Sequence, residues 1–316
     1  MAIEGMRYRS AGSKSALVTA GAGVTMPSVD QFIRFRRKFR CKLGCACDVP
    51  EYQRRPYILD YYRLEPPAVG QIFAAHNETL NVWTHLLGAL YFLLRGAVWV
   101  AGQWHDAQNG DGLHVPLRFP VTYYLLVGAT PVASAICMTA SSLFHWRSCS
   151  APKEYQICLC LDRSCVLLLI VESCFTGTII FFECHRYLQM GYLTMSTCLC
   201  GTTLATMIMP SWKKYQSLSL KATLFECIPI VHWFLCSYGK LRALWWGLLF
   251  TAFFYSFGVI FLVTGVPERW SPGKFDLVGQ SHQIWHICVF LGAAVWLETV
   301  FAALDVLKRN PGLCAV

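Results

Sequence analysis

Charged residues are scarce in this sequence, and their scarcity indicates the class of protein. Only 14% of the 316 residues are Asp, Glu, Lys or Arg, whereas 55% are hydrophobic, and the mean hydropathy is +0.42. Because about 25% of residues are charged in typical soluble domains, this composition excludes an ordinary soluble domain and indicates a protein of the lipid bilayer. Internal repeats and low-complexity tracts are also absent, and no nucleic-acid partner is expected.

Long stretches with few or no charges occur at intervals along the chain. A helix that crosses a membrane needs about 20 mostly apolar residues. The fifth of the candidate stretches contains Glu226 and Pro229 and is the weakest of them. We predict an all-α membrane protein with seven transmembrane helices in residues 76–304. The spans lie near 81–101, 119–144, 157–182, 187–209, 218–237, 243–265 and 282–304.

Positive charges are distributed unevenly between the ends of the predicted spans. Segment 31–42 contains six Lys or Arg residues, and the loop after the fourth span adds three more. Since short cytoplasmic segments collect Lys and Arg, residues 1–75 are predicted to be a cytosolic, basic amino-terminal region. Seven crossings then place the carboxy terminus, a short tail of residues 305–316, on the extracytoplasmic face.

Three cysteines, Cys41, Cys45 and Cys47, follow this basic segment. A structural zinc site needs four ligands, and no fourth ligand occurs nearby. Reversible palmitoylation is therefore the preferred interpretation, with unmodified thiols as the alternative.

Polar residues at the ends of three predicted spans fall at similar membrane depth. Ser141 and His145 end the second span, Asp162 lies about one turn into the third, and His282 and His286 begin the seventh. With the predicted orientation, all three helix ends lie on the cytoplasmic side. Because ionisable groups are costly inside a membrane, each one is a candidate for a functional site.

The histidines have a spacing that suits metal binding. Residues four apart lie on one face of a helix, so His282 and His286 can point at one ion, with His145 as a third ligand. Three histidines leave the fourth tetrahedral position of zinc open, and zinc lowers the pKa of its bound water to about 7 and polarises carbonyls. Asp162 is then the candidate proton acceptor, and Ser141 the candidate support for the water or for Asp162.

Packing is the alternative interpretation of these histidines. Most pairs of histidines four apart on a helix bind no metal, and only the third histidine and the aspartate at matched depth favour a site here. His85, near the inner end of the first span, is a rival ligand.

Five motifs in order resemble the progestin and adipoQ receptor family, which includes the adiponectin receptors. They are "RPYILDYYR" (55–63), "HNETLNVWTHLLG" (76–88), "SSLFH" (141–145), Asp162, and "VPERWSPGKFDLVGQSHQIWH" (266–286). The similarity runs over about residues 55–300. The motif "IPIVHW" (228–233) and the Trp within "SHQIWH" are most similar to the Golgi-resident member that tethers Raf kinase, whereas other motifs are shared with membrane progestin receptors and adiponectin receptors.

The resemblance implies a zinc ion held by His145, His282 and His286, with Ser141 and Asp162 beside it. It implies two functions. One is a receptor with ceramide amide hydrolase activity, whose partners are membrane lipids and an extracytoplasmic hormone-like ligand. The other is a receptor or scaffold without enzymatic activity, with structural zinc, that binds a steroid or adipokine-type ligand or tethers a cytosolic kinase. Either would be a multi-pass protein of the Golgi or plasma membrane.

The chain departs from the family pattern after the aspartate. Arg163 and Cys165 stand where members often have an aromatic or small residue and a glycine. An ion pair between Arg163 and Asp162, or a cavity reshaped by Cys165, would weaken activity more than zinc binding.

Overall fold

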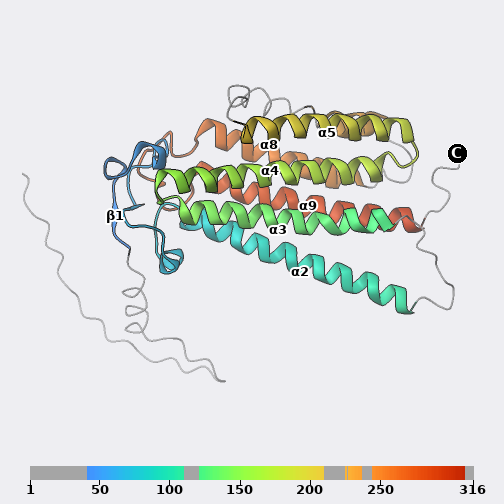
Figure 1. The fold of residues 1–316 in the computed structure, drawn as a ribbon, viewed down its shortest axis with the longest axis horizontal. Helices are drawn as coiled ribbons and strands as arrows, with labels where there is room; N and C mark the ends of the chain where they lie inside the picture. Colours follow the sequence, from blue (N-terminus) through green and yellow to red (C-terminus); the bar gives the residue numbers. More distant parts are fainter. Residues whose placement is uncertain (1–40, 110–120, 210–224, 226, 237–243, 310–316) are drawn as a thin grey trace, which may run out of the picture. The chain divides into compact units, whose positions relative to one another are not determined.

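Seven α-helices run through the described residues (Figure 1). The computed structural model describes residues 41–109, 121–209, 225, 227–236 and 244–309, which all belong to the compact unit Phe39–Val316. The helices are α2 (Thr79–Asn109), α3 (Val121–Arg147), α4 (Pro152–Phe181), α5 (Arg186–Ile208), α7 (Cys227–Cys236), α8 (Trp245–Thr264) and α9 (Ser281–Arg309). In these residues the strands are two elements of two residues each, so the predicted all-α fold is confirmed.

Five of these helices, α2, α3, α4, α8 and α9, are long and apolar enough to cross a membrane. The fifth predicted span, 218–237, is described only at 225 and 227–236, and α7, with ten residues, forms its helical part. The basic residues used to predict the orientation also lie largely outside the described residues, so the orientation stays a prediction. Helices α2 and α9 continue past the predicted span ends at 101 and 304, because helical hydrogen bonding does not stop where the apolar stretch stops.

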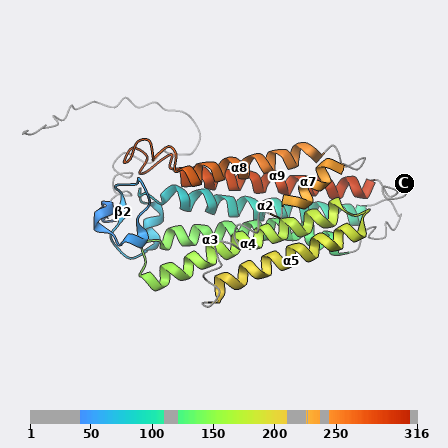
Figure 2. The same ribbon diagram turned by 90° about the horizontal axis from the view of Figure 1, so that it is seen from above.

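Helix α9 lies at the centre of the bundle, and α8 lies at its surface. α9 packs against α2, α3, α4 and α8, and both views place it among other helices (Figures 1 and 2). Of the most apolar window of each helix, 61% is buried in α9 but only 11% in α8. The exposed face of α8 is rich in large apolar side chains, among them Trp246, Phe250 and Phe253. This face therefore suits contact with lipid.

The segment before α2, residues 41–78, forms a cap at one end of the bundle, which we call the cap segment (Figure 1). Strand β1 (Leu43–Gly44) pairs antiparallel with β2 (Tyr62–Arg63). Three short 3₁₀-helices accompany them: η1 (Ala46–Asp48), η2 (Glu51–Gln53) and η3 (Val69–Phe73).

Cysteine pairing in the cap segment differs from the prediction. Cys45 and Cys47 form a disulfide, and Cys41 is free. The expectation of three thiols available for palmitoylation is therefore wrong for the bonded pair.

Hydrogen bonds attach the cap segment to the bundle end and to the loop before α9. The Asp276 carboxylate accepts from the backbone N–H groups of Leu59 and Asp60, at 3.1 and 2.8 Å. The Tyr52 hydroxyl donates to the backbone carbonyl of Ser150, in the turn between α3 and α4, at 2.9 Å. The cap segment is thus held on both sides of the helix ends that carry the predicted metal ligands.

Candidate metal centre

Two helices bring the three predicted ligand histidines together at the capped end of the bundle. His145 lies in the last turn of α3, and His282 and His286 lie in the first two turns of α9. The beginning of α9 is held by Glu268, whose Oε2 accepts from the backbone N–H of Ser281 at 2.7 Å. This contact satisfies a backbone donor that a helix start otherwise leaves unpaired.

The end of α3 is held by Arg63 of the cap segment. Its guanidinium donates to the backbone carbonyls of Trp146 at 2.7 Å and His145 at 2.8 Å. Arg63 is only 4% exposed, so these hydrogen bonds form away from bulk water. The backbone that carries His145 is therefore fixed by side-chain donors from the cap.

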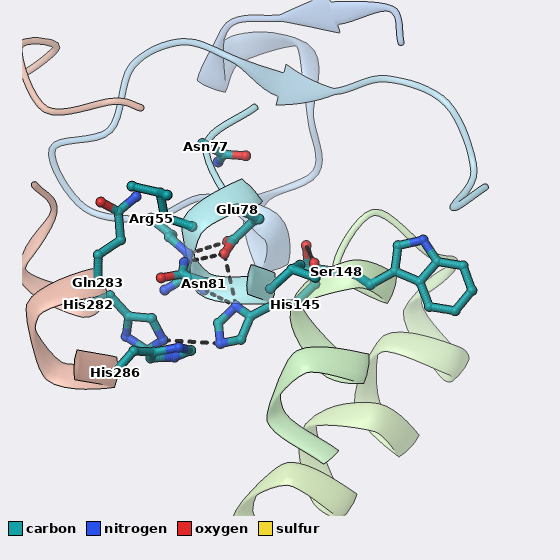
Figure 3. A network of polar contacts seen from close by, with 12 residues as sticks. Arg55, Asn77, Glu78, Asn81, His145, Ser148, His282, Gln283 and His286 are labelled. Carbon is teal, nitrogen blue, oxygen red and sulfur yellow. Dashed lines mark hydrogen bonds and ion pairs between the residues drawn. The ribbon is translucent and has the colours of Figure 1, made fainter. Parts of the chain in front are cut away.

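The side-chain nitrogens of the three histidines converge on one point (Figure 3). One nitrogen of each lies within 4.8 Å of the others, and Nε2 of His145 is 3.3 Å from Nε2 of His282. Two nitrogens bound tetrahedrally at about 2.0–2.1 Å from zinc are about 3.3–3.4 Å apart. His145 and His286 are each 1% exposed. The pair His145 and His282 therefore has the spacing of two zinc ligands, and all three residues supply the nitrogen donors that zinc prefers.

Contacts at the opposite ring nitrogens decide which nitrogen faces the centre. Nδ1 of His145 is 2.9 Å from Oε2 of Glu78, and Nδ1 of His286 is 3.4 Å from the Thr84 hydroxyl. An acceptor at Nδ1 keeps the proton there, which leaves the lone pair of Nε2 for a metal. Both Nε2 atoms are thus the available ligand atoms.

Glu78 is a buried carboxylate with hydrogen-bond donors around it. Its Oε1 lies 2.5 Å from Nε of Arg55, and its Oε2 accepts from the Asn81 amide at 2.5 Å. Burial by itself raises the pKa of the Glu78 carboxyl, but the Arg55 guanidinium and the His145 ring hold that pKa well below its usual range. Glu78 therefore acts as a hydrogen-bond acceptor beside the histidines.

Asp162 and Ser141 lie beside the histidines without joining the converging set. Ser141 lies close to the Asp162 carboxylate, and Asp162 is in electrostatic range of His145. The three atoms that converge come from histidines only. The position of Asp162 is compatible with the predicted role of proton acceptor, which stays a prediction.

The two departures from the family pattern lie away from the histidines. Arg163 is exposed, and none of the ion pairs of the described residues joins it to Asp162. Cys165 is buried in a small cluster with Cys137, Ala140 and Leu169. Within the described part of the chain, neither residue enters the histidine cluster.

His85, the rival ligand, has a different environment. Its ring stacks on the ring of His286 with centroids 3.7 Å apart, and its Nε2 is 3.3 Å from the backbone carbonyl oxygen of His286. An imidazole in this position packs against the ring of the candidate ligand His286 and does not point at the same centre. His85 therefore lies next to the site without being part of the ligand set.

Arg55, Arg63 and Glu78 were not identified as site residues from the sequence. Both Arg55 and Glu78 lie within motifs that carry the family resemblance, "RPYILDYYR" and "HNETLNVWTHLLG". The sequence did contain one signal for Glu78. This carboxylate lies immediately before a span that carries polar residues at the same depth. The contact with His145 spans 67 positions, so no local pattern could pair the two.

The apolar helices and the buried histidine cluster define an integral multi-pass membrane protein with a candidate metal centre. Comparison with known proteins narrows this class. Residues 73–297 match the model of the family described as haemolysin-III related, a range that contains all three histidines, Ser141 and Asp162. The chain belongs to this family, also called the progestin and adipoQ receptor family, and the resemblance stated above is confirmed.

Named relatives agree with this assignment. The chain is 34% identical to heptahelical transmembrane protein 1 of Arabidopsis thaliana, over 84% of this chain and 82% of that protein. It is 29% identical to heptahelical transmembrane protein ADIPOR1 of rice, Oryza sativa subsp. japonica, over 81% of this chain and 83% of that protein. It is 30% identical to the adiponectin receptor protein of Drosophila melanogaster, over 71% of this chain and 50% of that protein. The seven-helix, adiponectin receptor-like architecture follows from these matches together with the helices.

Proposed function

We propose that this protein is a zinc-containing receptor with intrinsic amide hydrolase activity on ceramide-like lipids. The observation that carries the proposal is the buried convergence of three histidine nitrogens, because three histidines leave the fourth tetrahedral position free, as in catalytic zinc sites. A zinc ion held by His145, His282 and His286 supplies Lewis-acid polarisation of an amide carbonyl and a water of lowered pKa.

The side chains around this position supply the proton transfers of amide hydrolysis. Asp162, with Ser141 beside it, accepts the proton that the attacking water loses as its oxygen bonds to the amide carbon. The same carboxyl returns that proton to the amide nitrogen as the C–N bond breaks. The products are a sphingoid amine and a fatty acid, and the apolar bundle provides a medium for both chains.

The test measures zinc content and ceramide turnover on the purified full-length protein and on His282→Ala. Removing one of three ligands should abolish stoichiometric zinc and lower turnover by more than the 10- to 100-fold that outer contacts of metal sites typically cost. His105→Ala, an exposed histidine near the far end of α2, is the matched control and should keep both. Turnover that survives zinc removal would contradict the mechanism.

A receptor or scaffold with structural zinc is the second candidate. It is favoured by the way the ligands join the end of α3 to the start of α9, since a metal there would pin two helices together whether or not it performs chemistry. Wild-type protein that contains zinc but turns over no ceramide would support this function and reject the first.

Partners and location form part of the same proposal. The exposed apolar face of the bundle fits membrane lipids as substrate or ligand. An extracytoplasmic hormone-like ligand and a cytosolic kinase are the other proposed partners, and the proposed location is the Golgi or the plasma membrane. Imaging of the tagged full-length protein in cells distinguishes the two membranes.

A further inference from the structure

Glu78 occupies the space between a candidate metal ligand and a cation from outside the bundle (Figure 3). One carboxylate oxygen, Oε2, is 2.9 Å from Nδ1 of His145, and the other, Oε1, is 2.5 Å from Nε of Arg55. Glu78 is 4% exposed. A carboxylate with both oxygens engaged in this way has one orientation available.

The proton on His145 can be placed from these contacts. Nδ1 of His145 also lies 3.2 Å from Nη2 of Arg55, and a guanidinium can only donate. If Nδ1 accepted from Arg55, its lone pair would face the Glu78 carboxylate at 2.9 Å, which is repulsive. It would also place the ring proton on Nε2, between His145 and His282, where a metal would bind. A proton on Nδ1 removes both conflicts, so Glu78 selects the tautomer that leaves Nε2 free.

The partner of Glu78 belongs to the cap segment and not to the membrane helices. Arg55 follows η2, 23 positions before Glu78, in a stretch held to the loop before α9 through Asp276. Tyr57 and Tyr61, on either side of that contact, have φ angles of 66° and 67°. Non-glycine residues adopt this left-handed conformation only when surrounding contacts hold them there. The position of Arg55 is therefore set by the folded cap.

We propose that Glu78 is a positioning residue for the metal ligand His145, and that Arg55 extends this control to the cap segment, so that the extramembrane cap sets the metal affinity of the intramembrane site. The inference rests on the proposed metal centre. Carboxylates that accept from the distal N–H of a ligand histidine orient the ring and increase its basicity. Here the carboxylate is itself oriented from outside the bundle, so displacement of the cap would loosen the ligand.

The experiment measures Zn²⁺ affinity by chelator competition on the full-length protein in detergent, for wild type, Glu78→Gln and Arg55→Gln. Glu78→Gln keeps the size of the side chain but removes its charge, and it should weaken Zn²⁺ binding about 10- to 100-fold. Arg55→Gln should weaken it in the same direction, because Glu78 loses the contact that orients it. Glu154→Gln removes a carboxylate that is paired with Arg147 at the same end of the bundle and should leave the affinity unchanged.

Cobalt substitution provides a measurement that a general loss of stability would not change. The visible absorption of bound Co²⁺ reports ligand geometry, and it should shift in Glu78→Gln but match wild type in Glu154→Gln. Thermal unfolding of the metal-free variants shows which of them fold. If Glu78→Gln does not fold, the Zn²⁺ affinity of Arg55→Gln alone decides. Wild-type Zn²⁺ affinity and Co²⁺ spectrum in the folded Glu78 and Arg55 variants would overturn the positioning role.

The outcomes separate this inference from the proposed function. Wild-type protein without zinc overturns both. Zinc-bearing wild-type protein that hydrolyses no ceramide overturns the hydrolase alone, while a loss of affinity in Glu78→Gln still supports the positioning role.

Discussion

At the scale of single residues, the capped end of the bundle contains polar side chains that are buried yet paired. His76 is an example, since it is 1% exposed and both ring nitrogens are engaged. Its Nε2 lies 3.0 Å from the carbonyl oxygen of Gln71, and its Nδ1 accepts from the backbone N–H of Glu78 at 3.1 Å. Protonation of Nδ1 would break the second contact, which fixes the residue before α2.

His76 predicts a pH dependence of stability. Burial, and then the nearby Arg63 cation, lower the pKa of His76 from 6.5 to about 3. The unfolded chain therefore binds more protons between these values, and the free energy of unfolding falls as the pH falls through this window. For one group the loss is about 2 kcal/mol between pH 7 and pH 5.

Thermal unfolding midpoints in detergent at the two pH values test this. His76→Asn should show a smaller decrease than wild type, because the substituted side chain does not titrate. The exposed His105 offers the control, and His105→Asn should keep the wild-type decrease. An unchanged pH dependence in His76→Asn would assign the acid sensitivity to other groups.

At the scale of the elements, small residues allow α8 and α9 to pack closely beside the candidate metal centre. A Cβ atom added at Gly258 of α8 would lie 2.7 Å from Cβ of Cys288 and 2.8 Å from Cε3 of Trp285. Both of these residues are in α9, within two positions of His286. Close approach of backbones through small residues is a common basis of helix association in membranes.

Gly258→Ala is therefore expected to destabilise the protein. Overpacking of this kind costs about 1–3 kcal/mol, which should appear as a lower unfolding midpoint in detergent. Gly201→Ala is the matched control, because a Cβ at Gly201 in α5 meets nothing within 4 Å. Equal unfolding midpoints for the two variants would show that α8 and α9 can move apart without loss of stability.

At the scale of the whole molecule, the number of crossings determines the relation between the chain ends. An odd number of crossings places the two termini on opposite faces of the membrane, and the basic amino-terminal region favours the cytosol for the first of them. In this orientation, the cap segment and the candidate metal centre face the cytosol together.

Epitope tags at either terminus test this arrangement in intact cells. A carboxy-terminal tag should be on the extracytoplasmic side, reached by an impermeant reagent at the cell surface or protected inside sealed Golgi vesicles. An amino-terminal tag should show the opposite behaviour. Both tags on one side would contradict seven crossings, and a reversed pair would contradict the orientation alone.

Hydropathy and helical spacing depend on residues close in the chain, and they determined the membrane class and the helical fold and indicated the candidate histidine set without a structure. The spacing of four placed His282 and His286 on one helix face, and the matched depth of His145 and Asp162 at the ends of two other spans favoured a site there. The stacked position of His85, by contrast, required the packing of α2 against α9, because depth alone left it a rival ligand.

Only the tertiary structure decided how the ligands are held. Glu78 and Arg55 contact His145 across 67 and 90 positions of sequence, and nothing in the cap segment's sequence indicates these two contacts. Such contacts depend on where the folded chain brings side chains together, and no local periodicity records them. The sequence by itself indicated which residues could bind a metal, and the fold decided which nitrogen of His145 faces the other two histidines, because a tautomer is set by the neighbours of the ring.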